Sequence, residues 1–352
     1  MARRAHGWPE MPLNAWPQKC RIAWENAIRK ETPFEDGGRA AAFAAPTLRT
    51  MRSLFGTLLH WLAARGELKD EDGPADCLTP TKFTAYLTDR RASCTANTVF
   101  NNVNMLSMTM SVLEPQQKWT WLRRNPLVPT RDEALASRKP IRPITLGPFF
   151  FNLLERLDKL DELPRSYPIA KQYRNFLIVA VFACTPLRLK NIVALSLGEN
   201  IFRHGGGYEI RYYSRSIKNK NQMTLQLPEE LMPHMDMYVS AYRPLLLQHY
   251  EHPDDSALWL ARKPGCISRS STQLIVARVT KEILGREATP HSFRHSAVTQ
   301  LLDGNTGGDV TAAALLGHRG LATMRTYYDL SSEAAKSGPW RELIAKYRPK
   351  TK

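Results

Sequence analysis

The chain has 352 residues, with 49 Lys and Arg against 33 Asp and Glu, and its formal net charge at pH 7 is +16. This length predicts two domains, or three, at roughly 100–200 residues each, and a hydrophobic fraction of 43% excludes a wholly disordered chain. The excess of positive charge indicates an anionic partner, most commonly nucleic acid, although such charge can also serve solubility alone.

The cysteines and the apolar runs indicate a reduced protein of the cytoplasm. The five cysteines are odd in number and form no C-x-x-C pair, so neither a disulfide framework nor a zinc ribbon is expected. The first residues, MARRAHGWPEMP, lack the apolar centre of a secretory signal. The longest apolar run, residues 176–184, is too short to span a bilayer, and no membrane partner is predicted.

The first part of the chain divides into a lead-in and a helical region. Residues 1–45 mix Pro, Trp and charge without clear periodicity, and they are predicted to form an N-terminal arm or a short helical lead-in. In residues 46–128 apolar side chains recur at steps of three and four, which predicts a small bundle of helices that each bury one face. The recurring positions are Leu48, Met51, Leu54, Phe55, Leu58, Leu59, Leu62, Val99, Val103, Leu106, Met110 and Leu113.

Proline marks the boundary between this bundle and the rest of the chain. Residues 126–148 contain five prolines, which remove amide donors and disfavour helix in the residue before each, so residues 129–148 are predicted to be an interdomain linker. Beyond it, apolar periodicity predicts further helices, and residues 207–227 alternate as a β-hairpin whose tip carries Lys218 and Lys220. The sequence therefore predicts a mainly α protein with a small β-hairpin or sheet.

Two motifs place basic side chains where they could bind one anion. His291 and Arg294 are three residues apart in PHSFRHSAVTQLL, so they share a helix face, and Pro290 suits the first turn of that helix. Arg188 follows the most apolar run of the chain, and because burial of an unpaired charge is costly, it must reach water or an anionic partner. A phosphate would match its planar fork of donors. Each of these side chains could instead lie on a solvated face.

A third motif lies near the C-terminus, where LLGHRGLATMRTYY places His318 nine residues before Tyr327. Gly317 and Gly320 allow a tight break in the chain before the next helix. A tyrosine at such a position is, in isolation, typical of a core, and the adjacent Tyr328 is an alternative to Tyr327 for any functional role.

A metal site is the competing interpretation of the histidines. His291 and His295 are four residues apart, as in zinc-binding helices, and His318 could be a third ligand. The zinc pattern H-E-x-x-H requires Glu where Ser292 stands, and two arginines beside the site would repel the ion. Neither a metal nor another cofactor is therefore predicted.

In their order along the chain, these motifs resemble the catalytic signature of the tyrosine recombinase (phage integrase) family. The matching residues are Arg188, Lys218, His291, Arg294, His318 and Tyr327. The resemblance covers about residues 175–330, and residues 46–128 are similar, less specifically, to the family's SAM-like core-binding domain. It implies a two-domain DNA clamp, with residues 149–335 as the catalytic domain and residues 336–352 as a C-terminal helix or tail.

The sequence also departs from the family's pattern and leaves one choice open. Pro186 stands where the family usually has Gly, and Asn191 stands where it often has an acidic residue. Lys220 could replace Lys218 as the catalytic lysine after a slip of two residues, although the following segment LQLPEEL favours Lys218.

The resemblance implies a metal-independent strand transesterification at a DNA phosphate. Tyr327 would attack phosphorus and form a 3′-phosphotyrosine, while Arg188 and Arg294 would neutralise the equatorial oxygens. Lys218 would protonate the leaving 5′ oxygen, and the two histidines of the signature would assist proton transfer or hydrogen-bond the phosphate. The enzyme would be a site-specific recombinase or integrase that serves integration, excision or transposition of a mobile element.

The implied partners are double-stranded DNA with specific recombination sites, further copies of the chain as a tetramer on paired sites, and accessory DNA-bending or directionality proteins. The source would be bacterial or phage-encoded, with the protein on the nucleoid. Two alternatives remain: a type IB topoisomerase-like relaxing enzyme, and a DNA-binding regulator that does not cleave. Candidate contacts to the DNA backbone are Arg52, Lys82, Arg123 and Lys220.

Overall fold

The computed structural model describes residues 8–32, 35–185, 187–205, 207–213, 222–251 and 255–304. The chain divides into two compact units, residues 1–140 and 141–352. Helices dominate both units, and the one three-stranded sheet that the described residues form lies in the second. This confirms the predicted mainly α architecture with a small β-sheet. None of the described helices is long and apolar enough to cross a membrane.

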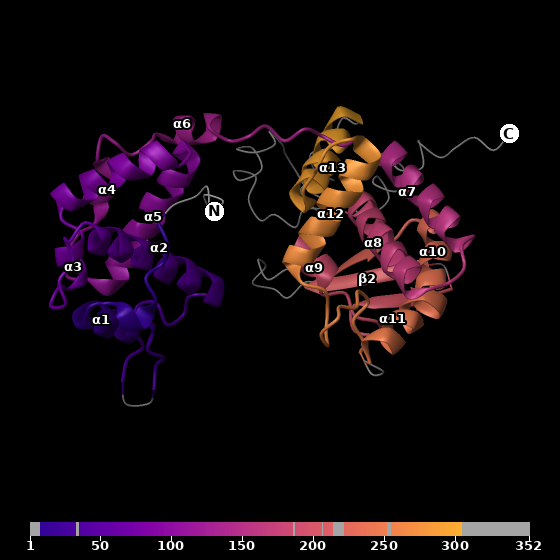
Figure 1. The fold of residues 1–352 in the computed structure, drawn as a ribbon, viewed down its shortest axis with the longest axis horizontal. Coiled ribbons are helices and arrows are strands. Elements are labelled where there is room, and N and C mark those ends of the chain that lie inside the picture. Colours follow the sequence, from indigo (N-terminus) through magenta and orange to yellow (C-terminus); the bar gives the residue numbers. More distant parts are fainter. Residues whose placement is uncertain are drawn as a thin grey trace. The chain divides into compact units, whose positions relative to one another are not determined.

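The first unit is a helical bundle (Figure 1). Its apolar core forms between helices that bury one face each, and the positions predicted from spacing are buried, except that Leu48 is only partly so. Helix α4 begins with a side-chain cap, in which Thr79 Oγ1 accepts from Lys82 N at 3.3 Å and Pro80 takes the first helical position. The helices are α1 (Gln18–Ile28), α2 (Ala45–Ala64), α3 (Pro74–Cys77), α4 (Pro80–Ser93), α5 (Ala96–Leu113) and α6 (Arg131–Ala136).

Part of the predicted lead-in is helix α1, which packs on the core of the first unit. Cys20, Trp24 and Ala27 are its buried residues, at steps of four and three. Trp16, just before the helix, lies edge-on against Phe55 of α2, with ring centroids 5.2 Å apart. Three buried positions make a short apolar stripe, which is why the periodicity of this helix is weak in the sequence.

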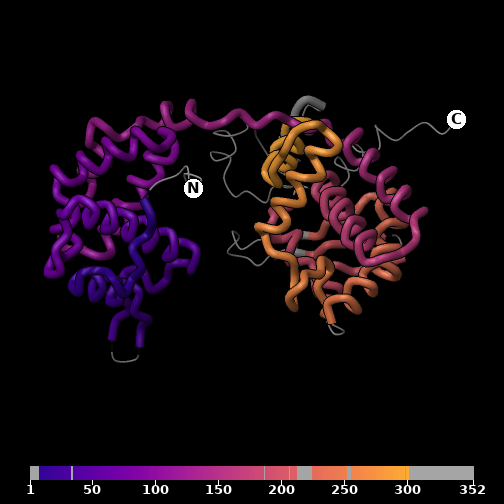
Figure 2. Tube along the Cα trace, in the orientation of Figure 1, coloured from indigo at the N-terminus to yellow at the C-terminus, as the bar shows by residue number. Residues whose placement is uncertain are grey.

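The predicted linker, residues 129–148, contains regular structure (Figure 2). Helix α6 begins with a capping box, in which Glu133 N donates to Thr130 Oγ1 at 3.2 Å and Thr130 N donates to the Glu133 carboxylate at 2.7 Å. Helix α7 (Leu146–Asp161) also begins inside this segment. Pro148 lies in its first turn, where a missing N–H leaves no helical hydrogen bond unmade. The density of prolines therefore overstates the length of the irregular connection.

The second unit is built around α8 (Figure 1). Twelve of the eighteen residues of this helix are buried, as expected of a helix that is apolar on most of its surface, and it contacts α7, α11, α12 and α13. The helices after α7 are α8 (Tyr167–Cys184), α9 (Leu189–Val193), α10 (Met232–Met237), α11 (Arg243–Tyr250), α12 (Arg269–Leu284) and α13 (Pro290–Gly304), and a short π-helical segment, Tyr238–Tyr242, joins α10 to α11.

The sheet confirms the hairpin predicted from alternating residues. Its strands β1 (Ile201–His204), β2 (Gly207–Tyr213) and β3 (Gln222–Gln226) are antiparallel in that order. Ile210 lies opposite both Ile201 and Leu225, and all three are buried in the core of the second unit.

Candidate functional site

Helix α13, which carries His291 and Arg294, begins with a reciprocal cap. Ser292 N donates to Thr289 Oγ1 at 3.3 Å, and Thr289 N donates to Ser292 Oγ at 3.2 Å. The two side chains thereby satisfy amides that the first turn of a helix leaves unpaired. The cap fixes where the helix starts and therefore which side chains its first two turns bury.

The buried face of α13 leaves both basic residues in contact with water. Phe293 is 1% exposed, and its ring lies 5.6 Å from that of Phe149 and 6.0 Å from that of Phe182. His291 is exposed and Arg294 is partly exposed. The apolar residue between them thus holds the helix to α7 and α8, while the basic side chains remain accessible to an anion.

Arg188 directly precedes α9, just beyond the C-terminal end of α8. Its carbonyl oxygen accepts from Asn191 N at 2.8 Å and from Ile192 N at 3.2 Å, which starts α9. Trp259 Nε1 donates to Ile192 O at 2.8 Å and fixes this short helix from the other side. The side chain of Arg188 is partly exposed and makes no hydrogen bond or ion pair within the described residues.

Aromatic packing holds α13, which carries Arg294, against α8, the helix that precedes Arg188. Phe182 lies in the last turn of α8, and its ring centroid is 6.0 Å from that of Phe293, the neighbour of Arg294. Both rings are buried, and α8 and α13 are in contact. The structure therefore places Arg188 four residues beyond the end of a helix, α8, that packs on the helix carrying Arg294.

The histidines of α13 titrate below the ordinary range. Protein atoms around the imidazole of His291 displace part of its hydration, which lowers its pKa, and the positive charge of Arg294 lowers this pKa further. The pKa of His295 is lowered by burial and then by His291. Both rings are therefore predominantly neutral at pH 7, and a neutral imidazole can either accept or donate a hydrogen bond.

The remaining residues of the predicted signature lie outside the described part of the chain. These are Lys218, His318 and Tyr327, together with the alternatives Lys220 and Tyr328 and the predicted C-terminal segment, residues 336–352. The paired strands β2 and β3 end and begin at Tyr213 and Gln222, which face each other, so both lysines belong to the connection between two paired strands.

The metal interpretation gains no support from the described residues. No group of three or more His, Cys, Asp or Glu side chains that could hold a metal ion occurs among them. His295 Nδ1 lies 3.4 Å from Thr299 Oγ1 on its own helix, and Ser292, at the position where the zinc motif needs Glu, is part of the helix cap.

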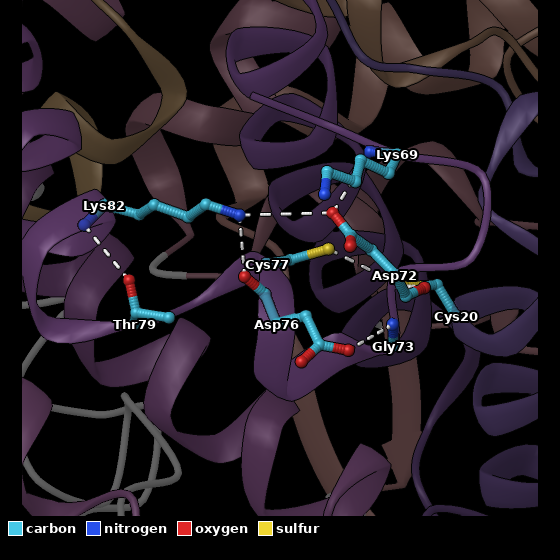
Figure 3. Close-up of polar contacts among 8 residues, drawn as sticks. All are labelled: Cys20, Lys69, Asp72, Gly73, Asp76, Cys77, Thr79 and Lys82. Carbon is cyan, nitrogen blue, oxygen red and sulfur yellow. Dashed lines mark hydrogen bonds and ion pairs between the residues drawn. The ribbon is translucent and has the colours of Figure 1, made fainter. Parts of the chain in front are cut away.

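Lys82, a predicted DNA contact, is engaged inside the first unit (Figure 3). Its Nζ donates to the carbonyl oxygen of Asp76 at 2.8 Å and lies 4.0 Å from Asp72 Oδ2. Asp72 also accepts from Lys69 N at 3.1 Å. These contacts tie α4 to α3 and the loop before it, and a phosphate would have to compete with them for the ammonium group.

Arg52 and Arg123, the other two described candidates for contacts to DNA, differ in whether another side chain already engages them. Arg52 pairs with Glu10 at 3.4 Å, and both side chains are partly exposed. Arg123 lies in the 3-10 turn Thr120–Arg124, is exposed, and has no ionic or hydrogen-bond partner within the described residues. Of the three, Arg123 is the side chain most available to a DNA phosphate.

Sequence reasoning missed two polar residues on the buried side of α13. Ser296 is fully buried and its Oγ accepts from Ile144 N at 2.7 Å. Gln300 Oε1 accepts from Leu146 N at 3.2 Å. The available signal was a Ser and a Gln that continue the spacing of Phe293 at steps of three and four.

Comparison with known proteins gives a consistent relationship. Residues 155–334 match the phage integrase family. The tyrosine recombinase XerC of Roseiflexus sp. (strain RS-1) is 27% identical over 187 residues, which cover 53% of this chain and 56% of that protein. XerC of Bifidobacterium longum (strain DJO10A) is 26% identical over 197 residues, which cover 53% of this chain and 52% of that protein. The chain thus spans about half the length of the curated relatives it matches.

A solved structure shares the fold. The XerH site-specific recombinase bound to a palindromic difH substrate, in its post-cleavage complex, aligns with a TM-score of 0.58 at 15% identity. The alignment covers 83% of this chain and 79% of XerH. Likeness at this level of identity establishes a common architecture.

Proposed function

Because the family match covers just over half of it, this chain belongs to the phage integrase family, and we propose that it cleaves and rejoins DNA strands at specific sites. The proposal is supported by the exposure to water of Arg188, His291 and Arg294 inside the matched region, and by the packing of α13 on the helix that precedes Arg188. Guanidinium groups with access to water, in a strongly basic chain, suit a backbone phosphate as the bound anion.

In the proposed reaction the phenolic oxygen of Tyr327 attacks phosphorus and the bond to the 5′ oxygen breaks. The strand is then held as a 3′-phosphotyrosine, and a free 5′-hydroxyl reverses the step on the same or a partner strand. Arg188 and Arg294 would stabilise the charge on the non-bridging oxygens. Removal of one such preorganised donor typically raises the barrier by about 3–4 kcal/mol.

In the proposed reaction, proton transfer would be carried out by Lys218 and the two histidines of the signature. Lys218 would protonate the leaving 5′ oxygen, and His318 would assist at the phosphate. The lowered pKa of His291 supports a role as a neutral hydrogen-bonding group, because a neutral ring can accept a proton from the nucleophile or contact a phosphate oxygen. This chemistry is built from the protein's own side chains.

The partners follow from the same proposal. Residues 46–128 would act as the core-binding domain and residues 149–335 as the catalytic domain of a clamp on double-stranded DNA, with Arg123 among the phosphate contacts. Strand exchange would take place in a tetramer on paired recombination sites, with accessory DNA-bending or directionality proteins. The biological role would be integration, excision or transposition of a mobile element in a bacterial cytoplasm.

The nucleophile is tested with a nicked suicide substrate that traps the covalent adduct. Wild-type protein should form the adduct, and Tyr327→Phe should abolish it while the dissociation constant for DNA stays unchanged. Tyr328→Phe is the matched control and should still form the adduct. The opposite pattern, with the adduct lost in Tyr328→Phe and kept in Tyr327→Phe, would assign the nucleophile to Tyr328.

Two further measurements separate the alternatives. Arg294→Ala should bind DNA but cleave at least about 100-fold more slowly, and normal cleavage would remove the phosphate role of Arg294. Cleavage should be unaffected by EDTA, and its loss would restore the metal interpretation. Relaxation of a supercoiled plasmid that lacks paired sites, without recombinants, would favour a topoisomerase-like enzyme, and binding without any adduct would favour a regulator.

A further inference from the structure

The segment that leads into the second unit is fastened to the helix that carries His291 and Arg294. Residues 142–146 run into the first residue of α7, and their main chain makes hydrogen bonds with side chains from α13 and from the turn before it. Figure 2 shows this stretch of chain reaching the start of α7. We call residues 142–146 the strap.

Several side-chain hydrogen bonds fix the strap. Ile144 N donates to Ser296 Oγ at 2.7 Å, and Leu146 N donates to Gln300 Oε1 at 3.2 Å. Gln300 Nε2 returns a hydrogen bond to Ile144 O at 2.5 Å. Arg286, between α12 and α13, donates to the carbonyl oxygen of Pro143 at 2.7 Å. Gln300 thus uses both ends of its amide on one short stretch of backbone.

The strap is stiff, and its hydrogen bond to Ser296 is buried. Pro143 fixes its own φ and restricts the residue before it, while the side chain of Ile144 is 1% exposed and Ser296 is fully buried. Hydrogen bonds in such an environment cannot be exchanged for bonds to water without loss. A displacement of the strap must therefore move α13 or break these bonds.

We propose that Ser296 and Gln300 are positioning residues, which hold α13 at the strap and so set where Arg294 and His291 meet the phosphate. The inference rests on the proposed function, since the position of α13 matters only if its basic residues act in cleavage. Because the strap continues into the connection from the first unit, it also gives that connection a direct mechanical attachment to the catalytic helix.

The test compares Gln300→Met with Thr299→Ala in the full-length chain. Methionine keeps most of the side-chain volume but removes both hydrogen bonds, whereas the bonds of Thr299 Oγ1 to described residues stay within its own helix. Single-turnover cleavage of the suicide substrate at saturating DNA should fall about tenfold in Gln300→Met, since small misplacements of catalytic groups are costly, while the dissociation constant for DNA changes less than about twofold. Thr299→Ala should match the wild type in both.

Amide exchange reports on the anchor independently of catalysis. The Leu146 amide should exchange faster in Gln300→Met and at the wild-type rate in Thr299→Ala. If it exchanges faster while cleavage is unchanged, or if cleavage and DNA binding fall together, the positioning role is wrong. A wild-type chain that protects this amide but forms no adduct would overturn the proposed function, and the inference with it.

A second variant covers the case in which Gln300→Met is too unstable to assay. Gln300→Glu keeps the acceptor for Leu146 N and regains a donor towards Ile144 O only when its carboxyl group is protonated. At about pH 7–8, where a carboxyl group of ordinary pKa is ionised, its cleavage rate should therefore fall below that of wild type while DNA binding is retained. A wild-type cleavage rate in Gln300→Glu would contradict a role for the bond to Ile144.

Discussion

Truncation of Phe293 tests whether aromatic packing holds α13, which carries His291 and Arg294, on α7 and α8. The ring is 1% exposed and lies within 5.6 Å and 6.0 Å of two other phenylalanine rings, distances at which such pairs attract each other. Phe→Ala in a core typically costs about 3–5 kcal/mol. Phe293→Ala should therefore destabilise the second unit by about 4 kcal/mol, a large part of the roughly 5–15 kcal/mol that stabilises a domain.

Urea unfolding, followed by hydrogen exchange of peptides from each unit, measures this effect. At an m-value of about 2 kcal/mol per molar urea, the midpoint of α8 peptides should fall by about 2 M, while peptides from α2 and α5 keep theirs. Leu274→Ala is the control, because this α12 side chain is 67% exposed and its truncation should cost less than about 0.5 kcal/mol. A loss below about 1 kcal/mol for Phe293→Ala, or an equal shift in the first unit, would refute the proposed packing role.

Three further predictions concern pH, capping and thiols. Burial lowers the pKa of His234 and of the two histidines of α13. Because the unfolded chain therefore protonates these imidazoles more readily than the folded chain does, the free energy of unfolding should fall as pH drops from about 7 to 5. His234→Gln should make this fall smaller. Thr289→Ala should cost about 1 kcal/mol in urea unfolding, and Thr289→Ser much less. In thiol labelling of native protein, exposed Cys266 should react quickly, whereas Cys20 and Cys77 should react only on unfolding, because both are buried. A hydrogen bond to Cys77, together with burial, also raises the pKa of Cys20 (Figure 3). Labelling of Cys20 or Cys77 in the native state would contradict this prediction.

The first unit shows how far apolar spacing can be trusted. A stripe such as that of α2 spans twenty residues and outweighs local variation, so its buried face was predictable. Helix α1 has eleven residues and three buried positions, too few to define a period. The linker was harder for another reason, because proline ends helices in general but is harmless in a first turn, where Pro148 lies.

Part of the candidate site was predictable from the sequence, and part was not. The shared face of His291 and Arg294 follows from helix geometry, and the cap at Thr289 could have been read from the Thr-x-x-Ser spacing. The main-chain amides that Ser296 and Gln300 bind lie about 150 positions earlier in the chain. No local sequence pattern predicts which distant amides a buried Ser or Gln will bind. Such contacts depend on how α7 meets α13, which only the folded unit determines.

Asn191 bears on how the two arginines divide their work in the proposed reaction. It occupies the first turn of α9 beside Arg188, at a position where the resembling family often has an acidic side chain. A carboxylate at position 191 would order the Arg188 guanidinium before DNA binds, but the carboxylate would also offset the positive charge of the guanidinium. Because Asn191 is neutral and Arg188 has no ion pair within the described residues, all the guanidinium donors of Arg188 remain for a phosphate. The side chain then loses more conformational entropy when DNA binds. Preorganisation would then depend mainly on Arg294, whose helix is fixed by the cap at Thr289 and by the strap.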